Sequence, residues 1–270
     1  MDLKRWLTGL LLAPIVVGAL LVGHNGAIFV LLCLVAILCL IEFFKITFPT
    51  LSLALRVLWY FLTIGLFWLL YSGEIHLFLF VAALWFFLPA LFVILFDPRP
   101  SSRKVEALAI GALGLIYICV PLVMLGLIVR HPAGNIWLLF LLVVVFSGDT
   151  GAFYMGRWVG RRRLHPTISP AKTWEGAVGG LVSSLIAGAW FIHLTGLDTL
   201  NPLTFSLIIL LSIVAQLGDL SESFIKRSFQ IKDSGRLLPG HGGFLDRIDG
   251  VLFASPVLYL HLAIKTLGVV

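Results

Sequence analysis

The sequence predicts an all-α, polytopic integral membrane protein with about nine transmembrane helices and a cytoplasmic N-terminus. Its 270 residues are 60% hydrophobic and only 12% charged, and the mean hydropathy is +1.08. Soluble domains average about half apolar and a quarter charged residues. Apolar runs of about 20 residues recur along the chain, and each can cross a bilayer about 30 Å thick as a helix. This composition excludes a soluble enzyme or binding module.

Apolar runs separated by polar breaks give the expected spans in chain order. Their ranges are 6–23, 27–44, 52–71, 76–96, 106–129, 135–152, 174–196, 203–220 and 250–268. The first run follows Lys4 and Arg5, as in a signal peptide, but no small-residue cleavage site before a soluble domain comes after it. We therefore expect an uncleaved first span and a single integral membrane domain over residues 1–270.

The basic residues divide unequally between the two sides of these spans. Of the 19 Lys and Arg residues, only two, Arg130 and Lys265, fall on the far side, which leaves 17 on the side of the N-terminus. The positive-inside rule therefore predicts that the N-terminus and the basic loops are cytoplasmic. Such a face also attracts anionic lipid headgroups. No nucleic-acid partner is expected, because no recognisable binding module accompanies the net charge of +6.

Acidic residues occur where two long polar loops, 153–173 and 221–249, meet their flanking spans. Asp149 ends one apolar run and Asp219 ends another. A carboxylate at the membrane edge is costly and usually faces a water-filled cavity or a partner, although a helix end reaching water would also explain it. If the helix continues beyond Asp219, four polar residues share one face, namely Asp219, Glu222, Ser223 and Lys226.

The second loop combines glycine, acidic and basic residues. Its turn-rich stretch 239–243 allows close backbone approach to a ligand, and Asp246 and Asp249 follow at i, i+3 spacing. Paired carboxylates without Cys or His ligand spacing suit Mg²⁺, which also binds substrate phosphates. The basic residues interleaved with them suit a polyphosphate, and they are Lys226, Arg227, Lys232, Arg236 and Arg247. The loop therefore favours a metal-bound nucleotide over a solvated charged face.

The first loop ends in a stretch that we interpret as the start of a helix. Ser169 would be the N-cap and Pro170 the first helical residue, so that free amides together with Lys172 hold a phosphate. Capping alone would also explain Ser169 and Pro170. The sequence therefore predicts an anion site here without excluding a purely structural helix start.

Other residues in the spans have simpler interpretations. Gly176 and Gly180 have the spacing of a close helix–helix contact. Glu42, near the inner end of the second span, either reaches the interface or lines a polar cavity, and its neighbours do not decide which. The cysteines lie in apolar runs without paired spacing, which predicts packing roles for Cys33, Cys39 and Cys119.

Three stretches resemble the signature of the phosphatidate cytidylyltransferase family, also called CDP-diacylglycerol synthases. They are Ser223 to Arg227, Lys232 to Gly235 and Leu238 to Asp249. So many constrained positions at fixed spacing are far more specific than a lone glycine-rich motif. Upstream, Gly151 to Arg157 and Ile168 to Gly176 also look like that family, although the Arg161-Arg162-Arg163 run is more basic. The resemblance implies a catalytic half at 134–270 and a set of apolar spans at 1–133.

The resemblance implies CTP:phosphatidate cytidylyltransferase activity on the cytoplasmic face of a bacterial-type inner membrane. CTP and phosphatidate would give CDP-diacylglycerol and pyrophosphate with Mg²⁺, with room for a second cation, and a homodimer fits this type of enzyme. Our hypothesis assigns the metal to Asp219 and Asp246 and catalytic roles to Asp149, Asp249 and Lys226. The substrate-binding residues would be Lys172, Thr173, Ser223, Arg227, Lys232, His241 and Arg247.

Two rival functions share some of these features. A CTP-dependent kinase of polyprenol-type lipids would also need a basic, metal-binding face, but it would release CDP instead of pyrophosphate. A lipid transporter would explain the spans and basic loops, although it should show midplane polar residues in two repeated halves. The Asp-Gly-x-x-Ala-Arg pattern of CDP-alcohol phosphotransferases is missing from the chain.

Overall fold

A computed structural model describes residues 18, 20, 25–232, 234–235 and 242–267. Over this part of the chain, eight helices are long and apolar enough to cross a membrane. The all-α membrane fold is therefore confirmed, and these eight helices match the second to ninth predicted spans in order. All but two residues of the predicted first span lie outside the described residues.

The N-terminal half contains four of these eight helices, the last of which is made of α5, a π-turn and α6, and the sequence explains several of their ends. Ser52 caps α3 by accepting a hydrogen bond from the Leu55 amide at 3.3 Å, and Gly73 ends the same helix with a left-handed backbone. Pro121 lacks an amide hydrogen, and a π-helical turn precedes it between α5 and α6. The elements are α2 (Asn25–Thr47), α3 (Leu53–Ser72), η1 (Ile75–Leu77), α4 (Phe78–Phe96), α5 (Ser102–Gly114), the π-turn η2 (Leu115–Cys119) and α6 (Val120–Val129).

Tryptophan side chains join α3, α4 and α5 in this half. The Trp59 indole donates to the Trp85 carbonyl oxygen at 3.1 Å, and the Trp85 indole donates to the Gly111 carbonyl oxygen at 2.7 Å. A Cβ on Gly111 would lie 2.0 Å from the Trp59 ring, so only glycine fits there. Both indoles are fully buried, and each buries a large apolar area with its one polar group satisfied.

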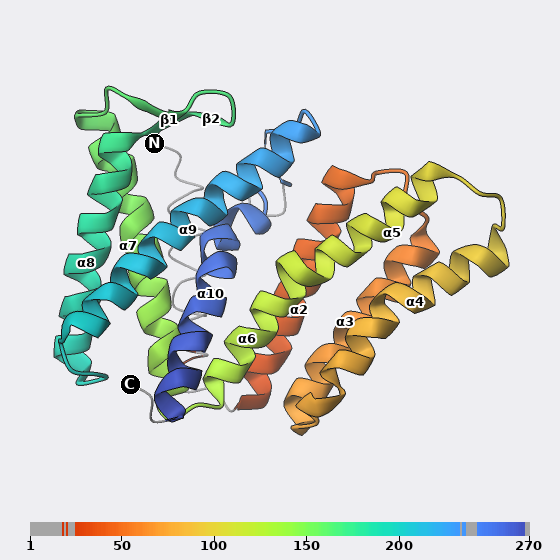
Figure 1. The fold of residues 1–270 in the computed structure, drawn as a ribbon, viewed down its shortest axis with the longest axis horizontal. Coiled ribbons are helices and arrows are strands. Elements are labelled where there is room, and N and C mark those ends of the chain that lie inside the picture. Colours follow the sequence, from red (N-terminus) through yellow and green to blue (C-terminus); the bar gives the residue numbers. More distant parts are fainter. Residues whose placement is uncertain (1–17, 19, 21–24, 233, 236–241, 268–270) are drawn as a thin grey trace.

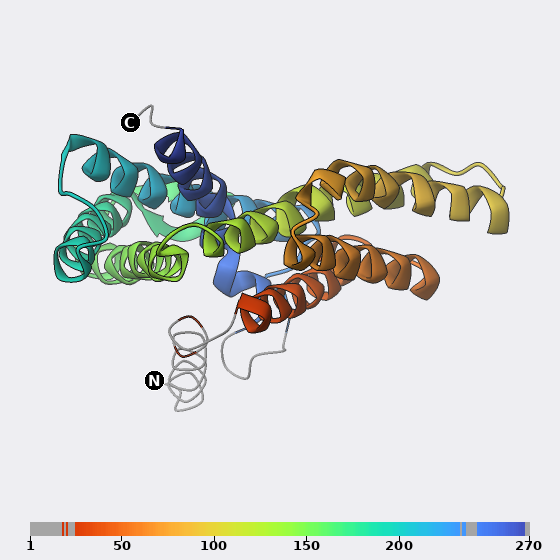
Figure 2. The same ribbon diagram turned by 90° about the horizontal axis from the view of Figure 1, so that it is seen from below.

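The C-terminal half is built around four long helices and a short hairpin. Figure 1 shows these helices gathered on one side of the molecule, and Figure 2 also places α4 at the end farthest from α8. We call the end of the bundle where the hairpin lies the hairpin end. The elements are α7 (Gly134–Trp158), β1 (Arg163–His165), β2 (Ser169–Thr173), α8 (Trp174–Thr195), α9 (Pro202–Ser228) and α10 (Leu245–Thr266).

Helices α7 and α8 approach closely because small residues line their contact. A Cβ on Gly180 would lie 2.8 Å from the Gly148 carbonyl oxygen, and one on Gly176 would lie 2.8 Å from the Ala152 carbonyl oxygen. This confirms the predicted packing role of Gly176 and Gly180. Across the two halves, the buried Ser255 hydroxyl of α10 donates to the Pro121 carbonyl oxygen of α6 at 3.0 Å.

The prediction that a helix begins after Ser169 is wrong. Ser169 to Thr173 form strand β2, which pairs antiparallel with β1, and α8 begins only at Trp174. Thr173 is the actual N-cap, because its hydroxyl accepts a hydrogen bond from the Gly176 amide at 3.1 Å. The Glu175 carboxylate accepts hydrogen bonds from the backbone amides of Arg161 and Arg162. These bonds hold the start of the hairpin against the first turn of α8.

The helices also extend further toward the hairpin end than the hydropathy pattern predicts. Helix α7 continues to Trp158, α9 to Ser228, and α10 already begins at Leu245. Acidic residues assigned to loop margins therefore lie on regular helices, which hold their side chains in defined directions. At the opposite end, Lys265 contacts Asp198 at 2.7 Å, and Arg130 donates to the Tyr71 carbonyl oxygen at 2.8 Å.

Candidate active site

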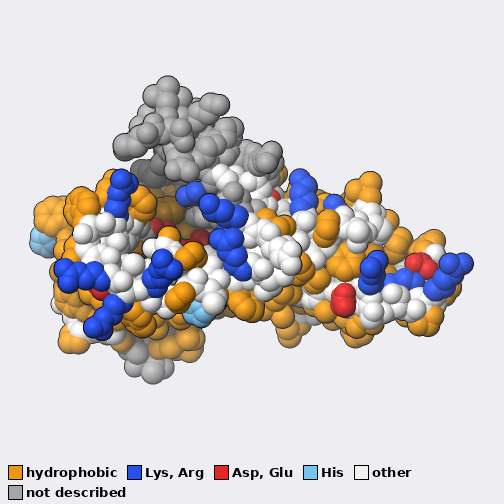
Figure 3. All heavy atoms as spheres, turned by 90° about the horizontal axis from the view of Figure 1, so that it is seen from above, with side chains coloured by type: hydrophobic (Ala, Val, Ile, Leu, Met, Phe, Trp, Pro, Cys, Tyr) orange, Lys and Arg blue, Asp and Glu red, His pale blue; other side chains and the backbone are white. Residues whose placement is uncertain are grey.

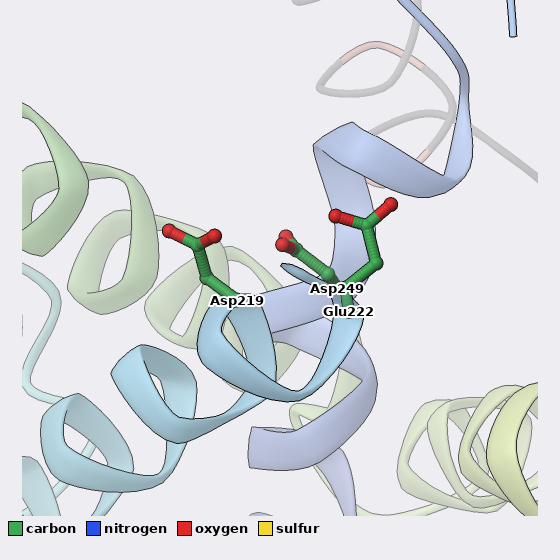
Figure 4. Close-up of side chains that lie close together, drawn as sticks. All are labelled: Asp219, Glu222 and Asp249. Carbon is green, nitrogen blue, oxygen red and sulfur yellow. The ribbon is translucent and has the colours of Figure 1, made fainter. Parts of the chain in front are cut away.

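Three carboxylates from two helices meet near the hairpin end. Asp219 and Glu222 lie one turn apart on α9, and Asp249 lies on the facing first turns of α10. One oxygen from each lies within 4.8 Å of the other two, and Figure 4 shows the three carboxyl groups directed to the same side. Glu222 is only 2% exposed and Asp249 only 7%. We call Asp219, Glu222 and Asp249 the acidic cluster.

A glycine brings the two helices close enough to form the acidic cluster. A Cβ on Gly218 would lie 2.6 Å from the Asp249 carbonyl oxygen and 2.9 Å from the Phe253 Cβ. Any larger residue would push α10 away from α9 at the turn that carries Asp249. Asp219 is the residue after Gly218, and Gly218 contacts the backbone of Asp249. The close approach at Gly218 therefore brings Asp219 and Asp249 near each other.

Two lysines contact carboxylates of the acidic cluster. Lys172 Nζ lies 2.5 Å from Asp219 Oδ2, and Lys226 Nζ lies 2.7 Å from Glu222 Oε2. Asp249 Oδ1 accepts the neighbouring Gly250 amide at 2.8 Å. Glu222 Oε1 is buried and has no hydrogen-bond partner among the described residues. Three carboxylates with two ammonium groups leave an oxygen-rich site that suits a hard cation.

Asp246 lies next to the acidic cluster but is bound differently. Its Oδ1 receives Lys226 Nζ at 2.5 Å, and its Oδ2 accepts the Gly243 amide at 2.8 Å and the Ser234 amide at 3.1 Å. It therefore shares Lys226 with Glu222. The sequence hypothesis that Asp246 is a metal ligand stays a prediction, since a cation there would have to compete with these donors.

Lys172 reaches the site from the hairpin. Strand β2 carries it to Asp219, while Arg227 Nε at the end of α9 donates to the Ile168 carbonyl oxygen at 3.4 Å. The two loops singled out in the sequence thus meet over one site. Asp149 on α7 interacts electrostatically with Asp219 and Lys172, so it is a fourth acid close to the cluster.

The other predicted site residues divide into three groups. Thr173 caps α8, and Ser223 lies half-buried on α9. Lys232 and Arg247 are exposed near the same end, and Arg247 has interaction partners. His241, like Arg236, lies outside the described residues. Figure 3, a view onto the hairpin end, shows acidic side chains inside a hollow bordered by Lys and Arg side chains.

Glu222 is the site residue that the sequence assignment did not include. Its signal was present, because it shares the predicted polar face with Asp219 and Lys226. What the pattern lacked was the position of α10, which buries Glu222 and places Asp249 beside it.

Comparison with known proteins identifies the family. The model of a family described as the cytidylyltransferase family matches residues 3–265, which is nearly the whole chain. The chain belongs to the cytidylyltransferase family. The match includes the N-terminal half, which contains none of the stretches on which the resemblance was based.

Curated relatives are similar to about half of the chain. A phosphatidate cytidylyltransferase of Brucella suis biovar 1 (strain 1330) is 47% identical over 145 residues, which are 50% of this chain and 49% of the relative. The protein of the same name from Bacillus subtilis (strain 168) is 44% identical over 131 residues, which are 48% of this chain and 49% of the relative. The chain thus matches about half the length of these relatives.

Proposed function

We propose that this cytidylyltransferase-family protein transfers the cytidylyl group of CTP to phosphatidate. The observation that carries this proposal is the acidic cluster with its two lysines at one end of a membrane helix bundle. A water-soluble metal nucleotide and a lipid phosphate can meet only at such an end. The relatives named phosphatidate cytidylyltransferase support the choice of phosphatidate as the acceptor.

The donor set fits Mg²⁺, the cation that the sequence hypothesis names. Mg²⁺ uses oxygen ligands and is usually held by one or two carboxylates together with substrate phosphates. Asp219 and Asp249 would hold it, with Glu222 as the third acid, and Asp149 supplies a further carboxylate for a second cation. The bound ion would neutralise the triphosphate and stabilise the pyrophosphate leaving group.

The residues of the chain would contribute positioning and charge neutralisation. An oxygen of the phosphatidate phosphate attacks the α-phosphorus of CTP, and the bond from this phosphorus to the oxygen bridging to the β-phosphate breaks, releasing pyrophosphate. The second pKa of a phosphomonoester is about 6, so the attacking group is already ionised at neutral pH. No strong base is needed, and the main obstacle is repulsion between two anions. Lys172 and Lys226 lie where they can reduce it.

We place the hairpin end in the cytoplasm of a bacterial-type inner membrane, where CTP is available. The positive-inside rule supports this orientation, since the two basic residues assigned to the far side, Arg130 and Lys265, both lie at the end opposite the hairpin. The resemblance to the family also leads us to expect a homodimer.

Product analysis tests the proposed function. The detergent-purified protein is incubated with labelled CTP, phosphatidate and Mg²⁺, with parallel reactions that contain EDTA or lack lipid. We expect CDP-diacylglycerol and pyrophosphate, and we expect both to disappear on chelation. CDP together with a phosphorylated lipid would instead identify a kinase. An absence of Mg²⁺-dependent turnover with either lipid class would overturn the proposal and favour transport.

A further inference from the structure

A glutamate of the N-terminal half is buried against the loop that leads into α10. Glu42 on α2 is 1% exposed, and its Oε2 accepts hydrogen bonds from the Ser234 hydroxyl at 3.2 Å and from the Leu245 amide at 2.9 Å. A buried carboxylate is stable only where donors compensate for lost hydration. Both of these donors come from the far end of the sequence, 192 and 203 residues away.

The contact with Leu245 supplies a cap that α10 lacks locally. The first amides of a helix have no partner within the helix, and a negative charge near them is favourable. Helix α10 begins at Leu245, and the preceding residue, Phe244, has no side-chain acceptor. The Glu42 carboxylate therefore acts as the acceptor at this helix start from another part of the fold.

Two glycines of the loop leave the space that this carboxylate occupies. A Cβ on Gly235 would lie 2.4 Å from Glu42 Oε1, and a Cβ on Gly243 would lie 2.6 Å from Glu42 Oε2. Gly243 would also collide with Ser234, since its Cβ would lie 1.7 Å from the hydroxyl oxygen. Two described positions of the loop before α10 therefore fit around Glu42.

A chain of hydrogen bonds runs from Glu42 to the acidic cluster. Ser234, which donates its hydroxyl to Glu42, donates its amide to Asp246 Oδ2 at 3.1 Å. Asp246 holds Lys226 at 2.5 Å, and Lys226 holds Glu222 at 2.7 Å. Asp249 follows one turn after Asp246 on the helix that Glu42 caps.

We infer that Glu42 is a positioning residue for the active site: its carboxylate fixes Ser234 and the start of α10, and thereby aligns Asp246, Lys226 and Asp249 with α9. The N-terminal half thus contributes a side chain to the organisation of the site in addition to anchoring it in the membrane. The inference rests on the proposed function for its turnover measurement and for the choice of Mg²⁺ and CTP as ligands.

Four variants test the inference: Glu42→Ala, Glu42→Gln, Ser234→Ala and the double variant Glu42→Ala with Ser234→Ala. Turnover is measured over a range of Mg²⁺ and CTP concentrations. We expect Glu42→Ala to raise the Mg²⁺ concentration for half-maximal rate and the KM for CTP by about tenfold, as for loss of a charge-assisted hydrogen bond. Glu42→Gln, which keeps one acceptor oxygen, should fall between wild type and Glu42→Ala. The double variant should be no worse than Glu42→Ala, because both changes break the same contact.

A second measurement does not depend on turnover. The rise in the melting temperature of the detergent-solubilised protein on adding Mg²⁺ and CTP should be smaller in Glu42→Ala than in wild type. Glu106→Gln, an exposed glutamate on α5, is the matched control and should behave like wild type in both measurements. If wild type has no cytidylyl transfer, the proposed function fails and this measurement still decides the inference.

A lower melting temperature with an unchanged response to Mg²⁺ and CTP would show that Glu42 is only structural and would overturn the inference. If Glu42→Ala does not fold, Glu42→Gln and Ser234→Ala decide. Wild-type dependence on both ligands in those two variants would overturn it equally.

Discussion

The two halves of the protein are stabilised in different ways. In the N-terminal half, α3, α4 and α5 are joined by large buried side chains, as where Trp59 and Trp85 donate to carbonyl oxygens of neighbouring helices. In the C-terminal half, α7 packs on α8 and α9 on α10 through glycines that bring backbones together. Close backbone contact tolerates little change, whereas a large buried apolar side chain can be exchanged for one of similar size.

This difference supports the proposal that the chemistry takes place in the C-terminal half. A carboxylate cluster needs several side chains held within a few ångströms, which requires short and rigid distances between helices. Gly218 provides such a distance between α9 and α10, beside Asp219 and Asp249. The N-terminal half reaches this region through Glu42, its described residue that bonds to the loop before α10.

The largest effect is expected from the acidic cluster. Asp219→Asn keeps the shape of the side chain but removes a charge from the proposed cation site, so we expect kcat/KM to fall by more than about 10³-fold. The melting temperature without ligands should not fall, because the change also removes repulsion from Asp249. Asp97→Asn, on the exposed link between α4 and α5, is the control. Near-normal turnover of Asp219→Asn would contradict the assignment.

Asp246→Asn then separates two roles within the C-terminal half. If Asp246 is a metal ligand, as the sequence hypothesis states, this variant should need more Mg²⁺ for half-maximal rate, as Asp249→Asn should. If it mainly holds Lys226, the KM for CTP should rise while the dependence on free Mg²⁺ stays as in wild type. Titrations of Mg²⁺ at saturating CTP distinguish these outcomes.

The next largest effect on kcat/KM is expected at one of two lysine–aspartate pairs that lie at opposite ends of the bundle. Lys172 lies 2.5 Å from Asp219, and Lys265 lies 2.7 Å from Asp198. We expect Lys172→Met to lower kcat/KM by about 10²-fold, because a charge that reduces repulsion between two phosphate groups is lost. Lys265→Met removes a similar pair far from the site and should leave kcat/KM within about twofold of wild type. Equal losses in both variants would mean that the pairs act only on stability.

Much of the fold could be predicted from the sequence, and the reasons are physical. Each span had to be apolar over about 20 residues, so hydropathy alone located the eight described helices. Helix ends were harder to predict, because the last turns of α9, residues 221–228, are polar and contact α10 and the hairpin through Lys226 and Arg227. Pro170 suggested a helix start, yet Thr173 caps α8 and the strand pairing extends Ser169 to Thr173.

The site was only partly predictable for a related reason. Asp219 and Lys226 were visible through their spacing on one helix face. The pairing of Lys172 with Asp219 and the role of Glu42 depend on contacts between distant segments, which spacing along the chain cannot reveal. Burial distinguishes Glu222 from an exposed helix-face glutamate, and burial comes from α10.

Replacing a glycine at a helix–helix contact should lower the free energy of unfolding more than replacing a side chain of the acidic cluster. Gly180→Val places a branched side chain where a Cβ would already lie 2.8 Å from the Gly148 carbonyl oxygen and 3.1 Å from the Ala152 Cβ. We expect overpacking to destabilise the protein by about 3 kcal/mol, measured by thermal unfolding in detergent. Gly65→Val on α3, where a Cβ would meet nothing within 4 Å, is the control and should change stability little.

The smallest effect is expected from the tryptophan contacts of the N-terminal half. Trp85→Phe removes the hydrogen bond to the Gly111 carbonyl oxygen but keeps an aromatic ring in the same space. The loss should be about 1 kcal/mol, because one buried hydrogen bond is lost while the Gly111 oxygen still accepts the Leu115 amide and most of the apolar contact remains. Since α4, which carries Trp85, lies at the end of the molecule farthest from α8, kcat/KM should stay unchanged in the same preparation. A larger loss of kcat/KM in Trp85→Phe than in Gly180→Val would contradict the proposed difference between the two halves. Packing among α3, α4 and α5 would then affect the site by a route other than Glu42.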